Sequence, residues 1–125
     1  YKFVINIQIF FQKITFIAMK QKKPIIIYTS CPDEQTAEKI SRLLLDEKLV
    51  ACSQIKEIKS FFQWQGKINK EAEFLMSVKT FEHLFHDIEE IIISHHPYDI
   101  PEIIAVPVYK INDSYNKWML DTIKS

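Results

Sequence analysis

Glycine is almost absent from this chain: Gly66 is the single glycine among 125 residues. Loops that hold phosphates in nucleotide-binding proteins need several glycines, because their backbone must approach the phosphates closely. The CxxC, HExxH and GxSxG motifs are also missing. These absences exclude the usual nucleotide-binding loops and the thioredoxin, metalloprotease and serine-hydrolase signatures.

The chain also has no net charge and few cysteines. Sixteen basic residues balance sixteen acidic residues, so we expect no nucleic-acid partner, because attraction to phosphate supplies most of that affinity. Cys31 and Cys52 are too few for a disulfide scaffold and indicate a reducing compartment, the cytoplasm. With 47% hydrophobic residues over this length, one domain with its own core is expected.

The first 18 residues stand apart from the rest. The first methionine is Met19, and we favour the interpretation that residues 1–18 lie upstream of the true start. Two alternatives stay open: a truncated signal or transit segment, so that organelle targeting remains open, and an extra strand, because apolar residues alternate over 3–9. The segment is too short and polar to predict a membrane span. Residues 19–125 are treated as one domain.

Hydrophobic periodicity predicts the elements of this domain. Residues 24–29 indicate a buried central strand, and the apolar spacing after Pro32 indicates a helix over about 33–48. The other expected elements are a strand from 49 with a bulge near 55–58, a turn at 65–67, a return strand over 72–79, a helix capped by Thr80, an edge or terminal strand at 103–108, and a short helix from Asn112 or Asp113. This β-α-β-β-α-β order with a C-terminal helix is the α+β, ferredoxin-like split βαβ arrangement, with one antiparallel sheet.

The central hairpin has two long arms and should extend past the rest of the sheet. Phe61, Phe62 and Trp64 lie near its tip. A projecting hairpin cannot bury these rings by itself, so we expect a partner chain to cover them.

A stiff connector follows the second long helix. It runs from His95 to Glu102, and Pro97 and Pro101 fix its backbone at two points. Two imidazoles, a phenol and two carboxylates lie within these eight residues. Both a functional site and a purely structural corner are consistent with this composition.

Six short segments occur in the order and spacing of one protein family. They are TSCPDE at 29–34, LVAC at 49–52, WQGK at 64–67, VKT at 78–80, HPYD with PE at 96–102, and Tyr115 with Trp118. Together they resemble the CutA family, the divalent-cation tolerance proteins, over roughly 24–120. The resemblance implies a homotrimer that exchanges long hairpins around a three-fold axis, binds copper(II) or other divalent cations, and has no established enzymatic activity.

The resemblance also implies metal ligands. In bacterial relatives these are a histidine pair and a cysteine, which point here to His95 and His96 with Cys31 as the thiol. From its own chemistry, Glu102 is a candidate third ligand. The cysteine of bacterial relatives falls on Thr29, however, so Cys31 is displaced from the family position. Adjacent residues in an extended segment point in opposite directions, so the two histidines need a bend to share one ion. A binding cleft between subunits would use Lys67, Tyr98, Asp99, Trp64 and Trp118.

Other interpretations compete with cation binding. The histidines could be hydrogen-bonded loop residues, and the aromatic residues could serve only packing. A trimeric signalling or adaptor module similar to the nitrogen-regulatory PII proteins is the alternative function, although their nucleotide site uses glycine-containing loops. An enzyme ranks last, because no nucleophile and base occur at a recognisable spacing. The sequence specifies neither the physiological metal nor a protein partner.

Overall fold

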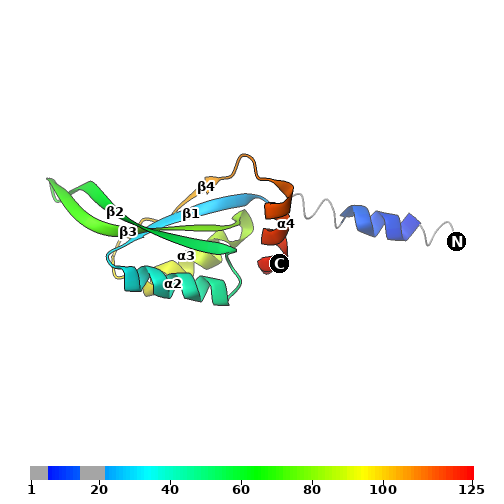
Figure 1. Cartoon of the computed structure of the whole chain (residues 1–125), viewed down its shortest axis with the longest axis horizontal. Helices are drawn as coiled ribbons and strands as arrows, with labels where there is room; N and C mark the ends of the chain where they lie inside the picture. Colours follow the sequence, from blue (N-terminus) through cyan, green and yellow to red (C-terminus); the bar gives the residue numbers. More distant parts are fainter. Residues whose placement is uncertain (1–5, 15–21) are drawn as a thin grey trace.

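The computed structural model describes residues 6–14 and 22–125 (Figure 1). Residues 6–14 precede the domain in sequence and form a helix. Because they are helical, the alternative that predicted an extra strand does not hold for them. The elements of the domain are β1 (Pro24–Cys31), α2 (Glu34–Asp46), β2 (Cys52–Trp64), β3 (Lys67–Phe81), a 3-10 turn (Glu82–Leu84), α3 (Phe85–His95), β4 (Ile104–Pro107) and α4 (Asp113–Thr122).

The four strands form one sheet in the order β2-β3-β1-β4, and every neighbouring pair is antiparallel. Helices α2 and α3 cover one face of it (Figure 1). This is the predicted ferredoxin-like α+β fold, with β1 in the interior of the sheet and β4, which contains Pro107, at an edge as expected. An edge position tolerates proline because no strand needs its missing N–H.

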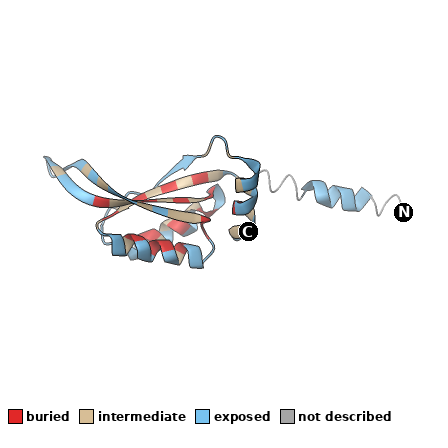
Figure 2. Ribbon diagram, viewed as in Figure 1, coloured by how far each residue is buried: buried red, intermediate tan, exposed pale blue. Residues whose placement is uncertain are grey.

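The core lies between the sheet and the two long helices (Figure 2). Burial alternates along β1, with every second residue from Ile25 to Cys31 buried. Ala37, Ile40 and Leu44 of α2 are fully buried at the predicted helical spacing, as are two isoleucines of α3. Each fully buried isoleucine or leucine side chain contributes about 1.5–3 kcal/mol, so this layer holds the helices on the sheet.

Of the two predicted helix starts, the first is confirmed and the second is wrong. Asp33 is the N-cap of α2, and its carboxylate accepts a hydrogen bond from the Thr36 N–H at 2.7 Å. Thr80 is not a cap. It lies in β3, and its hydroxyl donates to the Leu49 carbonyl oxygen at 2.6 Å. The strand extends this far because β1 pairs with β3 as far as Phe81, and α3 begins only after the 3-10 turn.

The predicted bulge in β2 is wrong. Pairing between β2 and β3 runs without interruption from Cys52 opposite Lys79 to Trp64 opposite Lys67. The irregular pattern has another cause: beyond β1 the hairpin has no helix beneath it, so no face needs a strict apolar alternation. The two turn residues have positive φ, 52° at Gln65 and 74° at Gly66, as in the two-residue turns that match strand twist.

The hairpin projects as predicted. β1 meets β3 only between Phe74 and Phe81, so residues 67–73 pair with β2 alone and extend past the sheet (Figure 1). Near the tip, Phe61 is 66% exposed and Trp64 53% exposed. The described part of the chain therefore covers these two rings only in part.

The face of the sheet opposite α2 and α3 is largely open. Pairing register places on it Ile26 and Tyr28 of β1, Leu75 of β3 and Ile58 of β2, all of which are only half-buried. Helix α4 packs at the end of the sheet farthest from the hairpin tip (Figure 1) and buries Met119. No helix among residues 6–14 and 22–125 is long and apolar enough to cross a membrane.

Candidate functional site

His96 ties the connector to the sheet. It ends α3 with an extended backbone, the conformation that the following Pro97 favours. Its Nε2 lies 2.8 Å from the Ser30 carbonyl oxygen, and its Nδ1 accepts the Tyr98 N–H at 3.2 Å. The imidazole is therefore neutral with its proton on Nε2. Both ring nitrogens are used, and the side chain is buried.

His95 lies in a different environment although it is the adjacent residue. It is exposed at the end of α3, and its Nδ1 is 2.9 Å from the Ile91 carbonyl oxygen. That contact fixes the ring and leaves Nε2 toward solvent, with no hydrogen bond to the described residues. A neutral imidazole nitrogen of this kind can accept a metal ion. The two adjacent histidines therefore lie in different environments.

Cys31 is the last residue of β1, and it is fully buried. Its Sγ lies 3.7 Å from the Met76 sulfur. Burial raises the pKa of the thiol to about 11, and the charges of Asp33 and Glu73 add to the shift. Because the thiolate is the metal-binding form, Cys31 is a poor ligand in this geometry.

Sequence reasoning did not identify Glu73 as a site residue. Glu73 is buried, and its carboxylate accepts a hydrogen bond from the Tyr98 hydroxyl at 3.0 Å. Burial first, and then this bond, raise the pKa of Tyr98 to about 12. The Tyr98 and His96 rings lie 4.8 Å apart. The connector is thus held at the point where β1 ends and the hairpin begins to project. No sequence signal identified Glu73 as the partner.

The other predicted site residues do not converge within one chain. Glu102 and Asp99 are exposed on the connector. Lys67 and Trp64 lie at the hairpin tip. Trp118 lies on α4 at the opposite end of the sheet (Figure 1), with its ring tilted against that of Tyr115 and the ring centroids 5.2 Å apart. Within the described ranges, no three His, Cys, Asp or Glu side chains are placed to hold a metal ion.

A second polar cluster joins α4 to the sheet. The Cys52 sulfur lies 3.6 Å from the Lys79 Nζ and 3.6 Å from the Tyr115 hydroxyl. Lys79 also donates to Gln54 at 2.6 Å. Burial, and then the contact with Cys52, raise the pKa of Tyr115 to about 12. These bonds position the α4 aromatic residues over the end of β2.

The two cysteines should differ sharply in reactivity. We expect iodoacetamide at pH 8 to alkylate half-buried Cys52 at least tenfold faster than Cys31, because Cys31 is buried and only roughly one thiol in a thousand ionises three pH units below its pKa. Peptide mass spectrometry with and without urea would measure both rates. Equal rates in the native protein would contradict the buried position of Cys31.

The raised pKa of Cys31 has a defined effect on stability. Because the folded state favours the neutral thiol, the buried thiol contributes to the free energy of unfolding. This contribution is complete at pH values below the ordinary cysteine pKa of 9.0 and is lost as the pH rises through the folded-state pKa of about 11.

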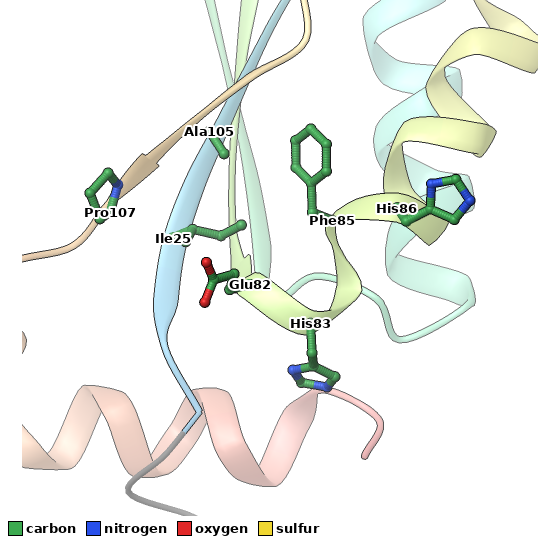
Figure 3. Close-up of a pocket in the computed structure, with 7 residues that line it drawn as sticks. All are labelled: Ile25, Glu82, His83, Phe85, His86, Ala105 and Pro107. Carbon is green, nitrogen blue, oxygen red and sulfur yellow. The ribbon is translucent and has the colours of Figure 1, made fainter.

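A surface pocket of about 540 Å³ lies elsewhere, between β1, β4 and the start of α3. Ile25, Phe85 and Ala105 form its apolar wall, whereas the His83 and His86 rings point away from one another (Figure 3). Burial and the charge of Lys22 lower the pKa of His83. None of the predicted site residues lines this pocket.

Sheet order, helix placement and the long projecting hairpin define a ferredoxin-like α+β domain with apolar surfaces suited to another chain. Residues 25–122 match the model of the CutA1 divalent ion tolerance protein family. This chain therefore belongs to that family, as its sequence motifs indicated.

Individual relatives agree with this assignment. The divalent-cation tolerance protein CutA of Pyrococcus horikoshii is 41% identical over 100 residues, which cover 80% of this chain and 98% of the relative. Human protein CutA is 35% identical, and the match covers 78% of this chain but 55% of the human protein. The crystal structure of CutA1 from Shewanella sp. SIB1 superposes with a TM-score of 0.80 at 34% identity, covering 83% of this chain and 98% of that one.

Proposed function

We propose that this chain forms a homotrimer that binds copper(II), and other divalent cations more weakly, and so contributes to cation tolerance in the cytoplasm. The open sheet face and the projecting hairpin together support the proposal that the chain assembles with copies of itself. Both cysteines are free, which fits a reducing compartment. No catalytic role is proposed.

The open face offers neighbouring subunits apolar side chains that alternate with polar ones such as Gln54 and Lys56. It combines the half-buried isoleucines of β1 and β2 with Phe62 and Trp64 of the hairpin, which are 39% and 53% exposed. Ile104 and Val106 of β4 are also exposed. Exposed apolar patches of this kind mark interaction sites. A neighbouring hairpin laid across this face would bury both sets of side chains.

For the cation, we propose His95 as the first ligand and Glu102 as the second from the same connector. Imidazole suits copper(II), which leads the divalent affinity order. His96 already uses both nitrogens, and Cys31 is buried and protonated. Either of these two would have to leave its present contacts to bind metal. A neighbouring subunit would complete the coordination.

Calorimetric titration with copper(II) tests the proposal on the reduced, tag-free protein. We expect saturable binding that His95→Ala weakens at least tenfold and Glu102→Gln weakens less. His86→Ala is the matched control, because His86 is another exposed histidine of α3, 3.2 Å from Glu90, and its loss should change nothing.

Two outcomes would contradict this site. Weak binding that is equal in the wild-type protein and His95→Ala would show that the connector is structural. Loss of binding in His86→Ala alone would place the cation on the helix surface. No observation favours the PII-like signalling alternative.

A further inference from the structure

The helix at residues 6–14 has one apolar side. Ile7, Phe10, Phe11 and Ile14 recur at the i, i+3, i+4, i+7 spacing of a single helical face. Ile9 lies about 200° around the axis from Ile7, among the polar residues. All nine residues of the helix are exposed, and Phe10 is 60% exposed. Phe10 and Phe11 stack edge to face with ring centroids 6.3 Å apart.

The charge of this part of the chain has one sign. The 32 residues that precede Asp33 contain five lysines and no acidic residue, whereas the remainder carries five more acidic than basic residues. Lys13 lies on the helix, and Lys22 and Lys23 come directly before β1. Only the Lys23 charge has an acidic neighbour among the described residues, Glu82 at 3.8 Å, and both of these side chains are well exposed.

Against the expectation that residues 1–18 lie upstream of the true start, we propose that the helix at 6–14 belongs to the protein and docks on an anionic membrane surface. Its apolar stripe would enter the boundary between headgroups and acyl chains, and the lysines would contact lipid phosphates. A lysine-bearing helix with an apolar side and no acidic residue has the pattern of an interfacial helix. A protein groove is a less suitable binding surface for this helix. The segment has no acidic residues, so its charges are attracted uniformly to any negative surface and do not specify one protein partner.

Co-sedimentation of the full chain with vesicles tests this proposal. We expect binding to vesicles of equal phosphatidylcholine and phosphatidylglycerol, and at least tenfold weaker binding to phosphatidylcholine alone. Ile7→Gln should weaken binding roughly tenfold by removing one buried aliphatic side chain. Ile9→Gln is the matched control, with the same substitution on the polar side, and should change binding less than twofold.

The electrostatic part is tested separately. Lys13→Gln should weaken binding to the anionic vesicles about fivefold and leave binding to phosphatidylcholine unchanged. A 19–125 variant, which retains every residue of the buried core, should no longer sediment.

Three results would overturn the proposal. One is equal loss of binding in Ile7→Gln and Ile9→Gln, and another is undiminished sedimentation of the 19–125 variant. The third is failure of the full chain to bind anionic vesicles at all, which would point to a protein receptor for this segment. None of these measurements depends on copper binding or on the trimer.

Discussion

Trp64→Ala is expected to convert the proposed trimer into monomers at low micromolar concentration while the subunit remains folded. Trp64 lies on the open side of β2 at the hairpin tip, where it is 53% exposed in the single chain. Buried aromatic anchors of interfaces cost about 2–4 kcal/mol when truncated. A trimer would suffer this loss at three equivalent positions, whereas the monomer loses only the contacts that its own hairpin makes with the covered part of the ring.

The same hairpin supplies a graded comparison. Phe62→Ala removes a ring from the same face and should also weaken assembly. Phe61→Ala removes one from the opposite face, where the Phe61 ring lies 5.8 Å from the Lys70 ammonium, and should leave the trimer intact. Sedimentation velocity would give the oligomeric state, and thermal unfolding would confirm the subunit fold. Trimers in both Trp64→Ala and Phe62→Ala would refute the role given to the hairpin.

His96→Ala should lower the free energy of unfolding by about 3 kcal/mol. The substitution leaves the Ser30 carbonyl and the Tyr98 N–H without their partners. An unsatisfied buried group costs about 1–3 kcal/mol, and these two partly buried groups lie at the lower end of that range. It also removes the ring that packs against Tyr98, 4.8 Å away. Urea unfolding followed by circular dichroism would measure the change.

His95→Ala is the matched control for this effect. His95 is exposed and contacts only the backbone of its own helix, so its loss should cost less than about 0.5 kcal/mol. The two variants should therefore separate stability from copper affinity: His96→Ala affects the first and His95→Ala the second. Similar stabilities for the two variants would show that the His96 contacts with Ser30 and Tyr98 contribute little.

The regular elements were predictable because they depend on local patterns. Alternation in β1 and the helical spacing of Ala37, Ile40 and Leu44 follow from the period of each backbone. Gly66 located the hairpin turn, since positive φ suits glycine. The length of the two arms then required the hairpin to project, with its aromatic residues uncovered.

The boundaries that failed depended on neighbouring strands. Thr80 has the chemistry of a helix cap, but pairing with β1 keeps it in β3. The β2 pattern resembled a bulge because the outer hairpin lacks a helix to enforce alternation. Both errors arise because local structure here depends on the tertiary surroundings. Pairing with β1 extends β3 through Thr80, and the lack of a helix beneath the outer hairpin relaxes the apolar alternation of β2.

By itself, then, the sequence determined the order of elements, the core positions, the projecting hairpin and the family. Only the tertiary structure decided which polar groups are partners. His96 reaches Ser30 across 66 residues and Tyr98 reaches Glu73 across 25. No local periodicity encodes such distant pairs, because their meeting depends on where the strands end and how the connector crosses them. That placement separates the structural His96 from the exposed His95, although the two are adjacent in sequence.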